Sequence, residues 1–214
     1  MRLRTLLMAA VCLTALAVPA WAEDVVDEHA PAFGLHGVYS FVPNSFLSLA
    51  YSKHTSISAV GYGAWLTYGF KQYDLAFQVN NWSAQMGNGE WLSQGATIDN
   101  AHWITTKGLG AADFSASILW KWRVHPAVEP FIGPTLGVAF LYGKVNEDDA
   151  NADQTSPNFG KPLGQPEKKT IPPVVPNVGF LTGCRFYPTP NFRISVDLGI
   201  YLGFSAGLSL GYAF

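Results

Sequence analysis

The chain has 214 residues, of which 49% are apolar and only 13% are charged. Soluble domains usually carry about a quarter charged residues, so this chain is short of the groups that keep a water-facing surface hydrated. The same apolar content excludes a disordered chain. The 13 Lys and Arg residues and 15 Asp and Glu residues give a formal charge of −2 without any basic block. The sequence therefore predicts no nucleic-acid partner.

The first 22 residues have the pattern of a secretory signal peptide. Two arginines precede the apolar stretch 6–18, which is followed by a proline and by the small-x-small cleavage signature Ala20-Trp21-Ala22. A retained membrane anchor needs about 20 apolar residues, more than this stretch offers. We therefore expect cleavage after residue 22, export, and a short periplasmic segment over 23–32. The mature chain keeps only Cys184, so no internal disulfide is expected.

Hydrophobicity alternates with a period of two in the segments 74–80, 113–123 and 193–203. Successive side chains of a strand point to opposite faces, so each segment predicts a strand with one apolar and one polar face. In the second segment the apolar face holds Phe114, Ala116, Ile118, Trp120 and Trp122. Weaker alternation is present in five more segments, 33–41, 58–70, 131–143, 178–187 and 205–214. Together they predict eight strands of about the 9–11 residues that cross a bilayer at a tilt.

The connections between these segments are short at one end and long at the other. Three are tight turns, at 71–73, 124–128 and 188–191, whereas the loops near 42–57, 83–112 and 144–176 are long. This arrangement is typical of outer-membrane barrels, whose bacterial single-chain forms have even strand numbers. We predict an all-β fold, an eight-stranded antiparallel up-and-down transmembrane β-barrel over 33–214. A short helix is expected over 44–52, and no fixed fold in the third long loop.

Two other folds compete for the final segment. Glycines recur every four residues at 199, 203, 207 and 211 in an uncharged run of 17 residues, which also fits a small-xxx-small transmembrane helix. A secreted β-sandwich is the other possibility. Four is an even spacing, however, so the glycines also share one face of a strand. A sandwich would have to bury long apolar stripes, whereas a barrel in lipid pairs every strand edge and gives those stripes an apolar solvent.

The pattern resembles the small eight-stranded outer-membrane β-barrel proteins of Gram-negative bacteria, over essentially all of 33–214. Its most specific element is the end of the chain, Gly207-Leu-Ser-Leu-Gly-Tyr-Ala-Phe214. This final strand, which closes on a C-terminal Phe, is similar to the signal that the barrel-assembly machinery recognises in that family. The resemblance implies a monomer in the cell outer membrane, with outer-membrane lipid and the assembly machinery as partners and no cofactor.

Charged residues fall on the strand face that points into the barrel. An eight-stranded barrel is just wide enough for its own side chains, and buried charges are normally paired. We therefore expect an ionic network that fills the lumen, formed by Asp74, Asp113, Lys121, Arg123, Arg185, Arg193 and Asp197. Gln78 and Asn80 fall on the same face. Four basic groups against three acidic ones predict that any pore would prefer anions slightly.

The sequence predicts a structural, surface-interaction or small-ligand role without catalysis, and it leaves the loop ligand open. A narrow pore or carrier for ions or small hydrophobic molecules is one alternative. The second is a lipid-modifying outer-membrane hydrolase, because His54 and Ser56 are the minimal base and nucleophile for acyl transfer. No carboxylate close in sequence orients that histidine.

A partial calcium-loop pattern lies in the third long loop. Asp149-x-Asn151-x-Asp153 matches the first three ligand positions of such a loop. The sixth and twelfth positions are Gln154 and Gly160 instead of Gly and Glu, so no metal site is predicted.

Aromatic residues collect at the strand ends, as in the girdles of membrane barrels. Trp82 lies at the long-loop end. The short-turn end holds Tyr68, Phe70, Tyr73, Trp120, Trp122, Tyr187, Phe192, Tyr212 and Phe214.

Overall fold

Eight long strands form the wall of a closed barrel in the computed structural model, which describes residues 30–201 and 203–214. The predicted signal peptide, most of segment 23–32 and Leu202 lie outside these residues. The wall strands are β1 (Ala32–Val42), β3 (Ile57–Gly69), β4 (Tyr73–Met86), β6 (His102–Lys121), β7 (Val128–Asp149), β9 (Val174–Phe186), β10 (Phe192–Ile200) and β11 (Phe204–Ala213).

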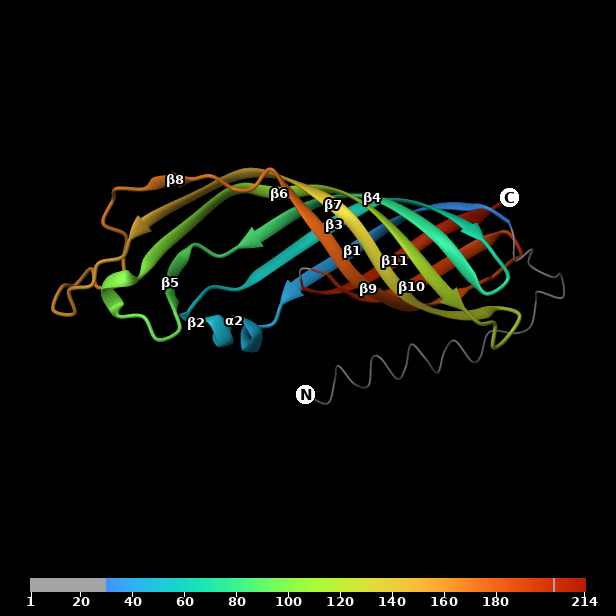
Figure 1. The fold of residues 1–214 in the computed structure, drawn as a ribbon, viewed down its shortest axis with the longest axis horizontal. Coiled ribbons are helices and arrows are strands. Elements are labelled where there is room, and N and C mark those ends of the chain that lie inside the picture. The colour runs from blue at the N-terminus through green and yellow to red at the C-terminus, as the bar shows by residue number, and fades with distance from the viewer. Residues whose placement is uncertain (1–29, 202) are drawn as a thin grey trace.

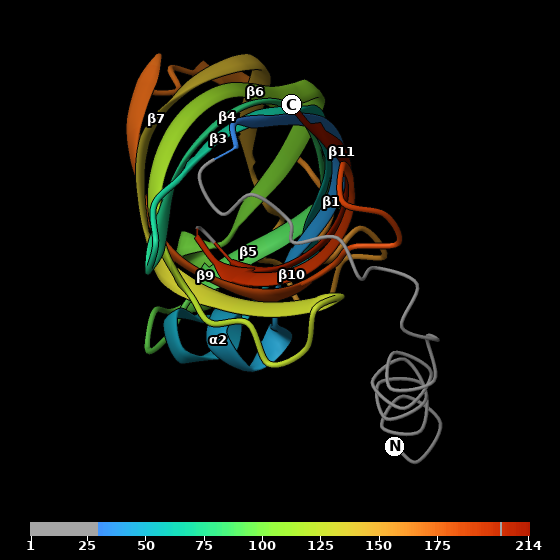
Figure 2. The ribbon, with the colours of Figure 1, turned by 90° about the vertical axis from the view of Figure 1, so that its right-hand side faces the viewer.

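Every wall strand pairs antiparallel with its neighbours in chain order (Figure 1). The sheet closes where β1 pairs with β11, from Ala32 opposite Ala213 to Phe41 opposite Phe204. Viewed along its axis, the wall forms a ring (Figure 2). Closure leaves no unpaired strand edge along the wall. The predicted eight-stranded antiparallel barrel is confirmed.

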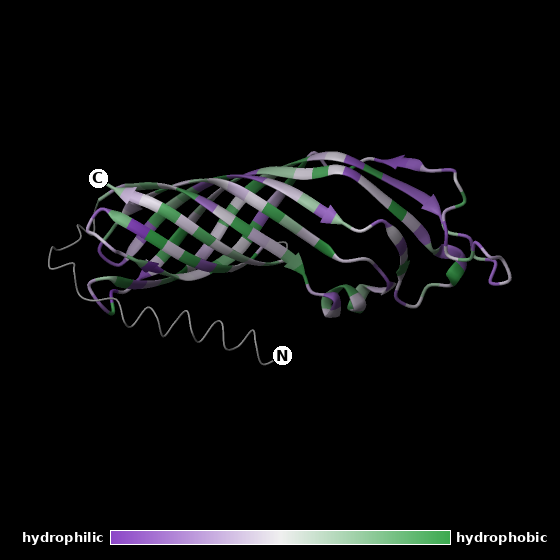
Figure 3. Cartoon of the chain, turned by 180° about the vertical axis from the view of Figure 1, so that it is seen from behind, coloured by the Kyte–Doolittle hydropathy of each residue, from purple (hydrophilic) through white to green (hydrophobic). Residues whose placement is uncertain are grey.

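The outer face of the wall is apolar. Large hydrophobic side chains alternate outward along each strand, and several are more than half exposed, such as Leu35 at 63%, Leu136 at 62% and Val178 at 64%. Figure 3 shows hydrophobic residues spread over the barrel, with hydrophilic residues more frequent in the extension beyond it. Exposing so large a continuous apolar surface to water is unfavourable, whereas the hydrocarbon of a bilayer solvates it well. The fold is that of a transmembrane barrel.

The glycine-rich end of the chain is strand rather than helix. Residues 192–200 form β10 and residues 204–213 form β11, and buried and exposed positions alternate strictly along β11. Gly199, Gly207 and Gly211 thus share the inward face, as an even spacing allows. Within the described ranges, no helix has the length and hydropathy to cross a membrane.

An extension continues from one side of the wall beyond the long-loop end. The two longest strands, β6 and β7, stay paired there as far as His102 opposite Asp149, past a bulge between Lys107 and Gly110. Three short strands join them: β2 (Tyr51–Lys53), β5 (Gly89–Ser93) and β8 (Glu167–Lys169). The 3₁₀ turn η1 (Ile98–Asn100) connects β5 to β6.

The predicted loops 83–112 and 144–176 were too long, since β4 ends at Met86, β6 begins at His102, and β7 ends at Asp149. Apolar alternation stops where the wall leaves the lipid, but backbone pairing continues through polar residues. The short helix expected over 44–52 is confirmed as α2 (Asn44–Ala50). In Figure 1, α2 lies beyond the end of β1, on the same side of the molecule as β2 and β5.

The third loop has a defined local fold, so the expectation of none was wrong. Its backbone bonds to itself, with Asn151 N–H donating to Lys161 O at 2.8 Å and Gly160 N–H donating to Asn151 O at 2.9 Å. In the partial calcium-loop pattern, the Asp153 carboxylate accepts hydrogen bonds from the Thr155 hydroxyl at 2.7 Å and from the Thr155 backbone N–H at 2.9 Å. These donors stabilise the ionised form and lower the pKa of Asp153 below its usual value.

Candidate functional site

Ion pairs occupy the short-turn end of the lumen. Asp74, the second residue of β4, forms an ion pair with Lys121, whose Nζ lies 2.8 Å from its Oδ1, and accepts a hydrogen bond from Arg185 on its other oxygen. Glu129, the second residue of β7, accepts one from Arg185 at 2.8 Å and one from Arg123 at 3.0 Å. We call these five residues the basal network. Arg185 lies at its centre, bonded to both carboxylates and 2% exposed.

Glu129 was absent from the predicted set. The sequence placed residue 128 in a turn and began the strand at Phe131, but β7 begins at Val128. Pro130 has no N–H for a strand ladder, which makes this stretch look like a turn. The signal that would have found Glu129 is parity, because it shares the inward face with Phe131 two residues later. The Tyr187 hydroxyl also donates to Glu129, at 2.9 Å.

Arg193 lies beside the basal network with a different set of contacts. Its Nη2 donates to the Thr67 hydroxyl at 2.9 Å, and its guanidinium carbon lies 4.0 Å from the centre of the Trp65 ring. That ring lies over Gly34 and Gly211, where a Cβ atom on either glycine would overlap it. No carboxylate of the described part of the chain is within salt-bridge distance of Arg193.

An apolar layer lies above the basal network. It consists of the buried residues Ala76, Leu119, Phe131 and Leu181, with Tyr201 packed against them. The guanidinium of Arg185 lies 4.6 Å from the centre of the Phe131 ring, so the two layers are in direct contact. A hydrogen bond of 2.8 Å between the Ser117 and Thr135 hydroxyls joins β6 to β7 at the same depth.

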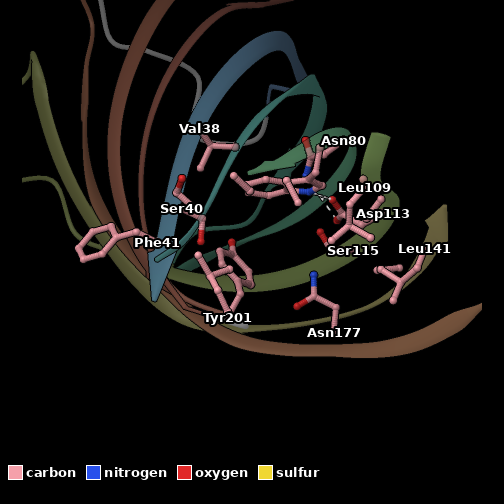
Figure 4. Close-up of a pocket in the computed structure, with 18 of the residues that line it drawn as sticks. Val38, Ser40, Phe41, Asn80, Leu109, Asp113, Ser115, Leu141, Asn177 and Tyr201 are labelled. Atoms are coloured by element: carbon pink, nitrogen blue, oxygen red, sulfur yellow. Dashed lines mark hydrogen bonds between the residues drawn. The ribbon is translucent and has the colours of Figure 1, made fainter. Parts of the chain in front are cut away.

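The lumen beyond the apolar layer contains a cavity of about 240 Å³. We call it the upper pocket. Its lining reaches the last residue of β1, Val42, and the first of β3, Ile57, so the cavity extends to the end of the wall from which the long loops leave. Figure 4 shows side chains from several strands converging on it. Apolar residues of its lining include Val38, Val42, Ile57, Leu109 and Leu141.

Two carboxylates, Asp113 and Asp197, line the upper pocket. Asp113 accepts hydrogen bonds from Trp82 Nε1 and from Asn80 Nδ2, the latter at 3.4 Å. Neither carboxylate has a cationic partner within residues 30–201 and 203–214, and Asp197 has no hydrogen bond there either. Both carboxylates therefore lie outside the basal network, contrary to the single network that the sequence suggested.

Further polar atoms of the lining lack partners among the described residues. They are Asn80 Oδ1, Asn177 Oδ1 and His36 Nδ1, on side chains that are each at least nine-tenths buried. The orientation of the Asn80 amide is fixed, because its nitrogen must face the Asp113 carboxylate, which only accepts hydrogen bonds. Buried polar groups normally find a partner. Unpaired groups around a cavity are what a binding site offers to a ligand.

The lumenal charges are unevenly distributed. With Glu129 included, the lumen has four basic and four acidic side chains, so the count on which an anion preference rested no longer holds. All four basic residues and two acidic ones lie at the short-turn end, whereas Asp113 and Asp197 lie at the upper pocket. The upper pocket is thus acidic, whereas the short-turn end of the lumen has an excess of positive charge.

Two aromatic residues expected in the girdles point inward instead. Trp82 lines the upper pocket and Tyr187 is 6% exposed beside the basal network. Parity places both on the inward face, with Asp74 and Arg185 respectively. Other members of the short-turn set do lie outward, and Trp120 and Trp122 are about half exposed. Ring contacts join Tyr68 to Phe70, Phe70 to Tyr73, and Tyr212 to Phe214.

The structure does not bring His54 and Ser56 together as a hydrolase pair. His54 Nε2 lies 3.0 Å from the Ser48 hydroxyl instead. The single proton of that hydroxyl goes to Asn44 O at 2.8 Å, so His54 is the donor to Ser48. A histidine that donates to a serine is not placed to remove its proton.

Pairing, closure and the apolar outer face define a small eight-stranded transmembrane β-barrel with a partly open lumen. No protein-family model and no curated protein sequence matches the chain.

Solved structures similar to this one are small outer-membrane barrels. The attachment invasion locus protein Ail of Yersinia pestis is 13% identical with a TM-score of 0.48, covering 87% of this chain and 99% of its own. Neisserial surface protein A is 15% identical with a TM-score of 0.44, covering 86% and 94%. The N-terminal barrel domain of Pseudomonas aeruginosa OprF is 13% identical with a TM-score of 0.43, covering 87% and 98%. At these identities the likeness concerns the fold alone.

Proposed function

We propose that this protein is a monomeric outer-membrane barrel that binds a small molecule in its upper pocket. The observation that carries the proposal is a cavity of about 240 Å³ bordered by buried polar atoms that have no partner in the described part of the chain. Such a site, largely apolar with a few convergent polar groups, is the usual form of a small-ligand pocket. Export by the signal peptide and insertion through the C-terminal signal at Phe214 belong to the same proposal.

Binding is favoured over passage because the lumen below the pocket is filled. The apolar layer and the basal network follow each other there, and most of their side chains are buried. An eight-stranded barrel has room for little more than such side chains. A molecule that enters the upper pocket therefore meets a closed floor.

Filling the pocket is expected to abolish ligand binding, and two adjacent alanines of β6 allow a matched test. Ala111 lines the upper pocket, whereas Ala112 is exposed on the outer face. The protein in detergent is titrated by calorimetry with 4-phenylbutylammonium, 4-phenylbutanol and 4-phenylbutyrate, three probes of similar shape and different charge. We expect saturable binding of at least one probe by the parent protein and by Ala112→Phe, and none by Ala111→Phe.

Empty micelles correct for partitioning of the probes into detergent, and faster migration of the unboiled protein on a gel shows that each variant is closed. Binding that survives in Ala111→Phe, or is lost equally in both variants, would contradict the proposal. The proposal also fails if the parent protein binds none of the three probes.

The filled lumen also bears on the alternative of a narrow pore. We expect the parent protein to give no single-channel steps in planar bilayers at moderate voltage, because opening a path requires separating the buried pairs around Arg185. Reproducible steps that change when Arg123 is neutralised would instead favour the pore.

A further inference from the structure

We propose that the upper pocket selects a small organic cation, a primary ammonium group on an apolar body. This inference rests on the proposed function and names the ligand class of the same site. It arises from three features of the pocket: the kind of unpaired atoms, the placement of charge, and the apolar part of the lining.

The polar atoms of the upper pocket that can still form hydrogen bonds are acceptors. Within residues 30–201 and 203–214, Asn80 Oδ1 is unpaired with its amide orientation fixed, and Asn177 Oδ1 is unpaired as well. The Asp197 carboxylate has no donor within the described ranges, and each oxygen of Asp113 accepts one hydrogen bond there and keeps a lone pair. A neutral His36 adds the lone pair of one ring nitrogen. The complement of such a set is a group with several N–H donors.

The charge distribution favours a cation at this level and opposes its further movement. Asp113 and Asp197 give the pocket two carboxylates without a cationic partner among the residues described. An ammonium ion has three donors and a full positive charge, and its hydrogen bonds to carboxylates are stronger than neutral ones. Below the apolar layer, Lys121, Arg123, Arg185 and Arg193 outnumber Asp74 and Glu129. That excess of positive charge repels a cation, so the site holds it and does not pass it on.

The mouth of the pocket suits an apolar body attached to the ammonium. Asp113 and Asn80 lie on one side of the cavity (Figure 4). The apolar side chains of Val38 and Leu141 also line it. Val42 and Ile57 continue this apolar border to the end of the wall. A ligand with its ammonium at the carboxylates therefore buries an apolar chain or ring among these side chains.

Removing the charge of either carboxylate separates this inference from the proposed function. Asp197→Asn and Asp113→Asn keep the side-chain shape, and Asp153→Asn is the matched control because it removes one carboxylate from an exposed loop. We expect the parent protein to bind 4-phenylbutylammonium at least about tenfold more tightly than 4-phenylbutanol, with 4-phenylbutyrate weakest. Asp197→Asn should lower the affinity for the ammonium probe about tenfold or more and leave that for the alcohol unchanged.

The outcomes are distinct. Equal binding of the alcohol and the ammonium, or tighter binding of the carboxylate probe, overturns the selection of cations and leaves the pocket as a ligand site. Equal loss of ammonium binding in Asp197→Asn and Asp153→Asn overturns it as well, because the effect would then be one of net charge. Absence of binding by every probe overturns the proposed function itself.

Discussion

Replacing Arg185 with methionine is expected to lower the free energy of unfolding by about 3–5 kcal/mol, the usual effect of removing one partner from a buried ion pair. Arg185 bonds to Asp74 and Glu129, all three side chains are almost fully buried, and the guanidinium also lies over the Phe131 ring. Methionine fills much of the same space but leaves each carboxylate with one cation fewer. The loss is measured by urea unfolding in lipid vesicles, followed by tryptophan fluorescence.

Lys107→Met is the control for this experiment. Lys107 is an exposed residue at the bulge of β6, so the same loss of one positive charge is expected to change stability by no more than about 0.5 kcal/mol. A similar small change for Arg185→Met would mean that the basal network contributes little to stability, and it would remove the reason to regard the floor of the pocket as closed.

Trp65→Ala is expected to have an effect of similar size, about 3–5 kcal/mol, as for other buried large-to-small substitutions. Trp65 is 5% exposed, lies over Gly34 on the neighbouring strand β1 and over Gly211 on β11, the next strand along, and has the Arg193 guanidinium over its ring. Alanine would leave a cavity above two glycines that cannot fill it, and would remove the cation–π contact of Arg193.

Trp122→Ala gives the matched comparison in the same unfolding measurement. Trp122 is half exposed at the short-turn end, where lipid replaces the lost contacts, so a clearly smaller loss is expected. Equal losses for the two tryptophans would contradict the assignment of Trp65 to a packed interior.

The barrel was predictable from the sequence because its signal is local. A period of two needs only neighbouring residues, and the parity of Asp74, Lys121, Arg185 and Arg193 placed each of them on the inward face. Strand ends were harder to predict. Glu129 lay beyond an assumed boundary at a proline, and the polar upper parts of β6 and β7 have no apolar alternation to mark them.

The division of the lumen into layers was beyond the sequence. Which inward residues meet depends on the register between strands, and glycine-rich strands specify register weakly. Asp74 on β4 and Arg185 on β9 are 111 positions apart in the chain, and only the pairing of both strands with the two wall strands between them, β6 and β7, brings them together. For the same reason, Asp113 and Asp197 were grouped with charges that lie at the other end of the barrel.

The central claim is that the upper pocket binds a ligand above a closed floor, and the indole N–H signals of the tryptophans test it most directly. Trp82 lines the pocket and donates to Asp113, Trp65 lies at the short-turn end, and Trp120 and Trp122 face outward. Nuclear magnetic resonance of the protein in lipid nanodiscs, titrated with 4-phenylbutylammonium, should show a saturable shift of the Trp82 indole alone. A constant Trp82 signal, or shifts confined to Trp120 and Trp122, would mean that the probe enters the lipid and not the pocket.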